Sequence, residues 1–543
     1  MRRTTAEKKK LNNYIRRCFM QLAGNNIFQR FCLGILALLF FASCQEGEER
    51  AERPNIVVIL ADDMGYSDLG SMGSEIATPN LDALAKDGLL FTNFYNTSRC
   101  CPSRASLLTG LYQHRAGVGA MNHDLGTPSY QGFLNDKCVT IAEVLKENGY
   151  HTIMSGKWHV GDERSQWPDQ RGFQDFYGIP KGGGLYFYPS EFIDRPIFRN
   201  SEQVFPEPES YYSTDNFTDE AIQFIKNGKE KDHPFFLYLA YIAPHYPLQA
   251  WPEDIAKYEG VYTEGYETIR QRRFARQKEL GIIPADLDLS PSDFQSWDSL
   301  QNKSEEARKM AVYAAQVDRM DQNIGKLIQA LKEEGKMNNT LILFLSDNGA
   351  CAEDVNRSPE AEVGGADSFV AYGQNWANVS NTPYRLYKSM THEGGIRTPL
   401  IAHWPNGIKG EGQIIRQVAH INDILPTCLA VAGAEYPEIY EGREVIAYDG
   451  NSFAGIFAQV NDSEKNKTAS EDALYWEHIG NQAIREEDWK LVKRGKQSWE
   501  LYDLSQDPTE LNDLSLSYPE KASSMEMRWQ HWADSVGVME RSK

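Results

Sequence analysis

Asn55-Ile-Val-Val-Ile-Leu60 is a continuous apolar run rich in β-branched residues, and Ala61-Asp62-Asp63 follows it at once. A short run without polar alternation is typical of a strand that is buried on both faces. Thr340-Leu-Ile-Leu-Phe-Leu345 repeats the pattern and leads into Ser346-Asp347-Asn348-Gly349. Both runs therefore predict central strands of a parallel sheet, each with polar side chains at its carboxyl end.

Strand and helix patterns alternate outward from these runs, from about residue 54 to residue 435. Phe235 to Ile242 predicts a further buried strand, and a helix with a capping box at Thr140 and Glu143 precedes a short strand that begins at His151. A long helix is expected from about Ser304 to Gly335. This alternation predicts an α/β fold in which helices sandwich a large, mostly parallel sheet.

The residue pattern changes after Ala434: short apolar runs alternate there with charged turns. We expect a main α/β domain at 54–435 and a smaller α+β subdomain with an antiparallel sheet at 436–543. Residues 255–310 are charged and show no clear period, so we interpret them as an irregular insertion near the substrate entrance.

The first 44 residues have the pattern of an export signal. Basic residues through Arg30 precede an apolar stretch, Phe31 to Phe41, that is too short to span a bilayer. Phe41-Ala-Ser-Cys44 is similar to a bacterial lipobox, with Cys44 as the lipidated residue and 45–53 as a linker. The pattern predicts a periplasmic protein or an outer-membrane lipoprotein of a Gram-negative bacterium that meets the membrane only through its lipid anchor. A plain cleaved signal, or a translation start at Met20, is the alternative.

The net charge of the chain disfavours some classes of binding partner. The 543 residues carry a formal net charge of −20, and residues 1–43 contain eight Lys or Arg and one Glu, which leaves a net charge of −27 for the rest. Such a surface argues against nucleic acid as a partner and against long-range attraction of polyanions. Cys101, Cys138, Cys351 and Cys428 fit no metal motif by their spacing, and nothing in the sequence supports a disulfide among them.

The strand ends predict a cation site. Ligands gather at the carboxyl ends of strands in an open parallel sheet, so Asp62, Asp63, Asp347 and Asn348 should lie close together. Their oxygen atoms are hard ligands, which favour Ca²⁺ or Mg²⁺ over zinc or copper. An Asp pair after a strand is by itself more typical of a turn or a helix cap. Clustered like charges, however, are costly unless a cation compensates them.

Cys100-Cys-Pro-Ser-Arg-Ala-Ser-Leu-Leu-Thr-Gly110 carries the most specific pattern. By itself it could be a buried thiol pair at the start of a helix. It resembles the signature of the sulfatase family, C-x-P-S-R followed by L-x-T-G, within the alkaline phosphatase superfamily. The string from Tyr384 to Gly395 is similar to the bacterial arylsulfatase-like branch. The resemblance implies that a maturation enzyme oxidises Cys100 to formylglycine (3-oxoalanine).

The resemblance also implies a set of site residues. Gly156-Lys-Trp-His159 and Ala243-Pro-His245 match family strings, and Lys388 lies five residues before Glu393. The implied metal is Ca²⁺, with Mg²⁺ as the less favoured ion, and its implied ligands are Asp62, Asp63, Cys100 in its oxidised form, Asp347 and Asn348. The implied catalytic residues are Cys100, Arg104, Lys157, His159, His245 and Lys388.

The implied reaction is the hydrolysis of a sulfate monoester through a covalent sulfo-enzyme. A hydroxyl of the formylglycine hydrate attacks sulfur, with Asp347 near enough to assist its deprotonation. Lys157, Lys388 and Arg104 neutralise the sulfuryl oxygens, and His245 protonates the leaving oxygen. His159 then takes the proton of the second hydroxyl, so that sulfate is expelled.

Two other functions stay open at this stage. Some phosphonate monoester and phosphodiester hydrolases also resemble the C-x-P-S-R pattern with formylglycine. A catalytically dead binder of sulfated glycans is the non-enzymatic alternative, although no expected site position is substituted. The natural substrate, a small-molecule or a glycan sulfate ester, is not determined by the sequence.

Overall fold

The computed structural model describes residues 53–184, 186–228, 233–293, 295–410, 412–459 and 473–539. The predicted export signal, with its lipobox Cys44, lies outside the described residues. In the part of the chain that is described, no helix combines the length and the apolar character needed to cross a membrane.

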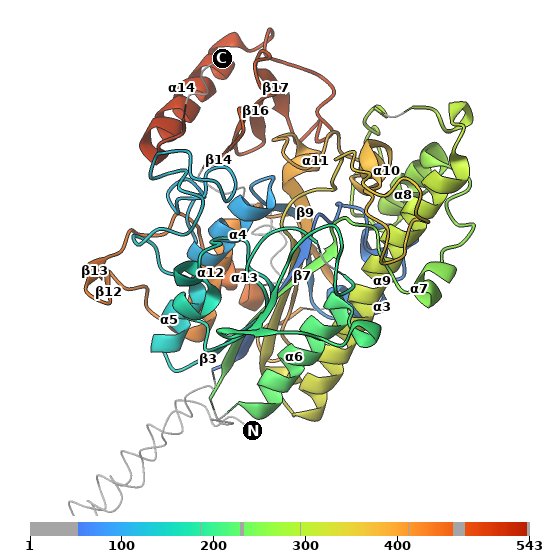
Figure 1. The fold of residues 1–543 in the computed structure, drawn as a ribbon. Helices are drawn as coiled ribbons and strands as arrows, with labels where there is room; N and C mark the ends of the chain where they lie inside the picture. Colours follow the sequence, from blue (N-terminus) through green and yellow to red (C-terminus); the bar gives the residue numbers. More distant parts are fainter. Residues whose placement is uncertain are drawn as a thin grey trace, which may run out of the picture. The chain divides into compact units, whose positions relative to one another are not determined.

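A sheet of eleven described strands forms the centre of the protein (Figure 1). β8, β1, β7, β3 and β4 are parallel neighbours, whereas β9 is antiparallel to both of its neighbours. The strands in order across the sheet are β10 (Gln413–Ile415), β2 (Leu89–Tyr95), β9 (Arg397–His403), β8 (Thr340–Ser346), β1 (Asn55–Asp62), β7 (Phe235–Pro244), β3 (His151–Lys157), β4 (Asp175–Ile179), β5 (Ile197–Arg199) and β6 (Glu202–Val204), with β11 (Ala419–His420) beside β2. The predicted mostly parallel sheet is confirmed.

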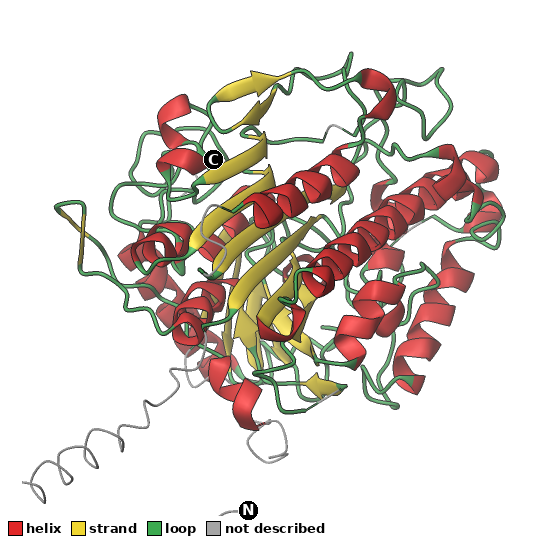
Figure 2. Cartoon of the chain, turned by 90° about the horizontal axis from the view of Figure 1, so that it is seen from below, coloured by secondary structure: helices red, strands yellow, loops and turns green. Residues whose placement is uncertain are grey.

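Helices cover both faces of this sheet, because alternate side chains of the central strands enter two separate apolar cores (Figure 2). Ile56 and Val58 illustrate one core, and Val57 and Ile59 illustrate the other. The first core is covered by α4 (Cys100–Thr109), α5 (Ile141–Glu147), α12 (Ile424–Ala432) and α13 (Ala454–Gln459). The second is covered by α3 (Pro79–Lys86), α6 (Ser213–Asn227) and α9 (Lys303–Glu333).

The prediction of an irregular insertion at 255–310 is wrong in one respect. This segment contains a regular helix, α8 (Tyr266–Glu279). Three of its five buried side chains are polar: Arg270, Arg273 and Gln277 are buried beside Tyr266 and Ile269. Arg273 donates to Asp68 over 2.6 Å and to Glu75 over 2.7 Å. A helix that buries charged side chains has no apolar period, and so the sequence pattern concealed it.

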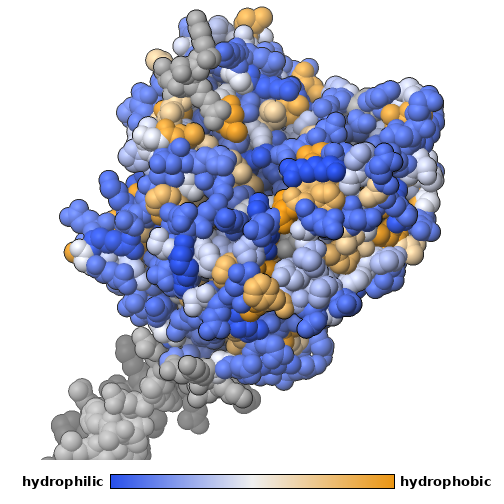
Figure 3. Space-filling model, viewed as in Figure 1, coloured by the Kyte–Doolittle hydropathy of each residue, from blue (hydrophilic) through white to orange (hydrophobic). Residues whose placement is uncertain are grey.

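The remaining described α-helices and β-strands are short, apart from one helix. They are α7 (Pro252–Ala256), α10 (Gly373–Ser380), α11 (Glu393–Ile396), β12 (Ile439–Tyr440) and β13 (Arg443–Glu444) before the C-terminal sheet, and β14 (Leu474–His478), β15 (Asn481–Glu486), β16 (Trp489–Lys493), β17 (Glu500–Asp503) and α14 (Pro519–Val536) within and after it. The four strands β14 to β17 form an antiparallel sheet, which confirms the predicted second sheet. The face drawn in Figure 3 is mostly hydrophilic, and its apolar residues lie in separate small groups.

A buried ion network joins this small sheet to the main domain. Lys490 of β16 is fully buried, and its ammonium lies 2.8 Å from Glu393 and 2.8 Å from Glu510. Arg397 of β9 lies 3.1 Å from Glu393. Burial would raise the pKa of Glu393, but Lys490 and Arg397 outweigh it and lower that pKa to about 2. Glu393 is therefore ionised and depends on these cations.

Replacing Lys490 by Met should destabilise the folded state by about 3–5 kcal/mol, because two buried carboxylates would lose their shared cation. Chemical denaturation at neutral pH measures the loss. Lys496→Met is the matched control, since Lys496 is exposed in the turn after β16, and it should change stability by less than about 0.5 kcal/mol. Equal stability of the two variants would contradict a structural role for the network.

Candidate active site

The pairing of β1 with β8 brings the predicted carboxylates together. Ala61 lies opposite Ser346 in the parallel register, and the Asp347 N–H donates to the Ala61 carbonyl over 3.1 Å. The Asp63 N–H donates to Asp347 Oδ1 over 3.2 Å. Asp63 has a φ of 68°, in the left-handed region, so the chain turns sharply at the end of β1. Asp62, Asp63 and Asp347 are all buried.

Helix α4 carries the signature residues onto this edge of the sheet. Cys100 is its first residue, Pro102 stands in its first turn, and Gly110 ends it with a φ of 69°. Arg104 is fully buried, and its Nη2 lies 3.1 Å from Asp347 Oδ2 and 3.3 Å from Asp62 Oδ2. Its Nη1 donates to the Lys157 carbonyl over 2.7 Å. Arg104 thus joins α4 to β1, β8 and β3.

The end of β3 supplies Lys157 and His159. Lys157 forms a buried ion pair with Asp62. His159 follows the strand by two residues and has a φ of 62°, in the left-handed region, so the chain turns sharply there. A Cβ atom at Gly182 would lie 1.9 Å from His159 Nε2. A side chain at position 182 would therefore displace the His159 imidazole.

His245 and Lys388 approach Asp63 from the other side. His245 follows β7, and its Nε2 lies 3.4 Å from Asp63 Oδ2. The Lys388 ammonium lies 2.7 Å from the same carboxylate. Asn348 Nδ2 donates to Asp63 Oδ1 over 2.7 Å. Contacts of this kind bring all the sequence-predicted site residues into one buried cluster.

Burial and neighbouring charges shift the ionisation of these groups. Burial, together with the Asp62 charge, holds the pKa of Asp347 well above its usual value. Burial opposes the ionisation of Asp62 as well, but Lys157, His245 and Arg104 lower its pKa. Burial lowers the pKa of His159 to about 4, so its imidazole is neutral at neutral pH and can accept a proton.

The donor set fits a hard divalent cation. Asp62, Asp63 and His245 each offer a ligand atom, and these atoms lie within 4.8 Å of one another. Asp62 Oδ1 and Asn348 Oδ1 are buried without a hydrogen-bond partner among the described residues. Unpaired buried oxygens are costly, and a bound cation would satisfy them. The same cation would remove the repulsion between Asp62 and Asp347.

Sequence reasoning missed a charged pair beside Lys388. Arg99 Nη1 lies 2.8 Å from Glu353 Oε1 and 2.8 Å from Ser389 Oγ. Tyr246, whose ring centroid lies 4.4 Å from that of His245, donates to Glu353 Oε2 over 2.7 Å. Burial would raise the pKa of Glu353, but Lys388 and Arg99 lower it to about 2. Glu353 stands in an irregular segment without periodic pattern, so only its proximity in space reveals it.

Comparisons with known proteins agree with this geometry. The family model described as Sulfatase matches residues 54–434, which is most of the chain. The chain belongs to the sulfatase family. A second family model, described as N-sulphoglucosamine sulphohydrolase, C-terminal, matches residues 384–531 of this sulfatase.

Two curated relatives and one solved structure illustrate the similarity. An uncharacterized sulfatase of Schizosaccharomyces pombe is 36% identical over 91% of this chain and 95% of its own length. The arylsulfatase of Klebsiella aerogenes is 37% identical over 75% of this chain and 92% of its own length. The crystal structure of Ps i-CgsB in complex with k-i-k-neocarrahexaose is 30% identical, covers 89% of this chain and 93% of its own, and has a TM-score of 0.67. This sulfatase is a sulfuric ester hydrolase with the alkaline phosphatase-like fold.

Metal loading should be visible in stability as well as in activity. At about 100 times its dissociation constant, a bound cation stabilises the folded state by about 2.7 kcal/mol. We expect Ca²⁺, added to chelator-treated enzyme, to raise the melting temperature and restore turnover. Asp62→Asn should weaken both effects, because it removes an anionic ligand.

The control for the metal experiment is Asp354→Asn, which removes an exposed carboxylate of the segment after β8. It should behave like the unaltered enzyme in both measurements. Full activity in a preparation that elemental analysis shows to be free of metal would contradict the assignment.

Proposed function

We propose that this sulfatase hydrolyses sulfate monoesters through a formylglycine made from Cys100. The observation that carries the proposal is the position of Cys100 at the head of the buried helix α4, whose Arg104 reaches both Asp62 and Asp347. A sulfate ester repels nucleophiles by its negative charge, so fixed cations around the nucleophile are required. Arg104, Lys157 and Lys388 supply them at this edge of the sheet.

In the first step, one hydroxyl of the formylglycine hydrate attacks sulfur and the ester S–O bond breaks. Lys157 and Lys388 hold the sulfuryl oxygens, and Asp347 assists the deprotonation of the attacking hydroxyl. His245 protonates the leaving oxygen, which departs as an alcohol or phenol. The sulfuryl group is then bound covalently to the side chain of residue 100.

In the second step, His159 takes the proton of the remaining hydroxyl of residue 100. The C–O bond to sulfate then breaks, the aldehyde reforms, and water regenerates the hydrate. The low pKa of His159, about 4 because of burial, supports the role of a base that starts out neutral. Serine or cysteine would lack the second hydroxyl and would stay sulfated.

The metal proposed here is Ca²⁺, held by Asp62, Asp63, Asp347, Asn348 and the oxidised residue 100. Such an ion supplies Lewis-acid polarisation of the sulfuryl group and of the nucleophile. The oxygen-rich donor set supports Ca²⁺ without excluding Mg²⁺.

A sulfated glycan fragment is the substrate class that we favour, with a small-molecule sulfate ester as the other. The similarity to Ps i-CgsB, whose structure holds k-i-k-neocarrahexaose, supports the glycan class. Export as a lipoprotein through Cys44, to the periplasm or the outer membrane, would place the enzyme where such fragments arrive. A formylglycine-generating enzyme is the partner that maturation requires.

The modified residue should be Cys100 and not Cys101, because only Cys100 stands at the signature distance from Pro102 and Arg104. Peptide mass after expression with a maturation enzyme should show the thiol-to-aldehyde change at Cys100. Cys100→Ala should abolish turnover, while the matched Cys101→Thr should keep most of it. An unmodified Cys100 in fully active protein would refute the mechanism.

Replacing each of the two histidines should impair a different step of the reaction. His245→Ala should slow esters of poorly acidic alcohols far more than activated aryl sulfates, because a good leaving group needs little protonation. His159→Ala should complete the first step and accumulate the sulfo-enzyme, seen as a burst of one alcohol per site followed by near arrest.

Equal losses on both leaving-group classes, together with no burst, would show that these roles are assigned wrongly. Matched sulfate and phosphonate esters, measured on the unaltered enzyme, distinguish the proposed reaction from phosphonate ester hydrolysis. Faster turnover of the phosphonate ester would favour that alternative.

A further inference from the structure

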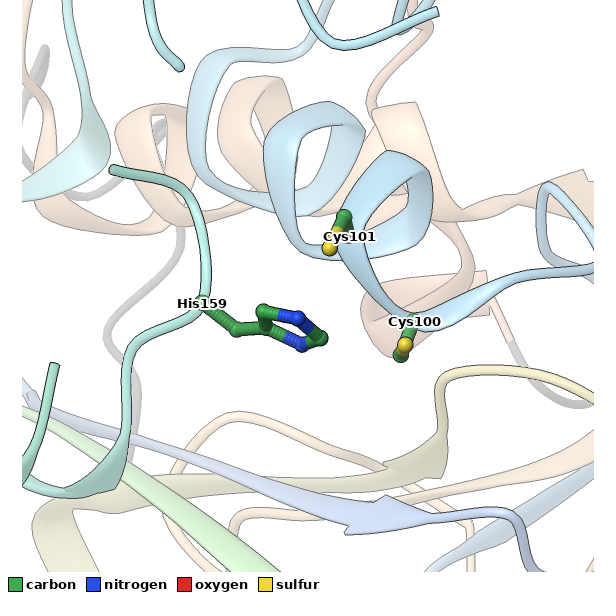
Figure 4. Close-up of side chains that lie close together, drawn as sticks. All are labelled: Cys100, Cys101 and His159. Carbon is green, nitrogen blue, oxygen red and sulfur yellow. The ribbon is translucent and has the colours of Figure 1, made fainter. Parts of the chain in front are cut away.

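Three side chains with sulfur or nitrogen donors gather at the head of α4. Cys100, Cys101 and His159 each offer a ligand atom, and these atoms lie within 4.8 Å of one another. Figure 4 shows the two cysteines on the first turn of the helix and the imidazole of His159 beside them. All three side chains are buried. The proposed sulfate chemistry uses Cys100 only after its oxidation and does not use Cys101.

The spacing suits a single thiophilic ion. Bonds of about 2.3 Å to sulfur and about 2.0–2.1 Å to imidazole nitrogen place the ligand atoms of one ion about 3.5–4 Å apart. The three atoms therefore need to move by about 1 Å or less to share an ion. His159 Nδ1 is buried and has no hydrogen-bond partner within the described part of the chain. Two thiolates and an imidazole select soft or borderline ions such as Cu⁺ and Zn²⁺.

The donor set decides between these two ions. Arg104 and Lys157 lie close by, but both are paired with Asp62 or Asp347, so their charges favour neither ion. Zn²⁺ takes four protein ligands in structural sites, whereas the described residues bring together three ligand atoms here. Two of these three are thiolates, the soft ligands that select Cu⁺. The site therefore favours Cu⁺.

We propose that the folded chain, before Cys100 is oxidised, binds one Cu⁺ through Cys100, Cys101 and His159. Binding releases the two thiol protons and leaves copper in the +1 state, so no oxidant or reductant is needed. Oxidation of Cys100 replaces its thiol by an aldehyde and so removes one copper ligand. This step rests on the proposed function. The copper-bound form is then a dead end, because its Cys100 is no longer a free thiol.

The test is an anaerobic titration with Cu⁺ against a competing chelator, using the full chain expressed without a maturation enzyme. The unaltered protein should bind one more tightly held Cu⁺ per chain than either Cys100→Ser or Cys101→Ser. His159→Ala should weaken this binding by at least about tenfold, the lower end of the effect seen when a partner of a metal ligand is lost. Cys428→Ala, which removes a buried thiol of α12, is the matched control and should bind like the unaltered protein.

X-ray absorption of the copper-loaded, unaltered protein gives a second measurement that needs no variant to fold. It should show two sulfur neighbours and one nitrogen neighbour around copper. Unchanged Cu⁺ affinity in Cys101→Ser, or copper surrounded by sulfur alone, would overturn the proposal.

Protein in which mass measurement shows complete oxidation of Cys100 should lack this Cu⁺. If Cys100 proves not to be oxidised at all while Cys100→Ser still loses the ion, the proposed sulfate mechanism fails and the copper site stands. Full retention of the tightly held Cu⁺ after complete oxidation would overturn the copper site instead.

Discussion

The parallel pairing of β1 with β8 is the constraint on which the rest of the site depends. It places Asp62 and Asp63 beside Asp347 and Asn348, and all four side chains are buried. Carboxylates held so close repel one another unless cations compensate them. Arg104, Lys157 and Lys388, brought from α4, β3 and the loop before α11, answer this repulsion in the folded chain. The same cations then suit an anionic substrate.

These buried cations lie within a strongly acidic protein. The chain has a formal net charge of −20, so a sulfate ester gains no long-range attraction from the surface as a whole. Recognition must arise at short range, where Lys157, Lys388 and Arg104 are buried and their charges are poorly screened. Glu353 adds a negative group near Lys388, held by Arg99 and Tyr246.

The C-terminal sheet supports the site from a distance. Lys490 binds Glu393, which lies five residues after Lys388, and Trp476 donates to the Asn96 carbonyl over 2.7 Å ahead of α4. Two segments that carry site residues are thus anchored on the small sheet. The small sheet therefore packs on the neighbouring strands and loops through buried charges as well as apolar contacts.

The sequence by itself determined the central strands and the family, and it predicted a set of site residues that the structure brings together, because all of these depend on local patterns. Buried parallel strands are apolar over their whole length, and the Cys100 to Gly110 stretch is a contiguous motif. Helix α8 escaped prediction because three of its buried side chains, Arg270, Arg273 and Gln277, are polar and weaken its apolar period. Strand β9 escaped as well, since Pro399 interrupts it and a proline within a run argues against a strand.

Only the tertiary structure decided which distant side chains meet. Arg99 pairs with Glu353, and His159 lies beside both Cys100 and Cys101, although no spacing along the chain relates these residues. Their proximity follows from the order of the strands and from the packing of α4 on the sheet. Such contacts join residues that are far apart in the sequence. A sequence pattern relates only residues within one helix, strand or motif, so it does not predict these contacts.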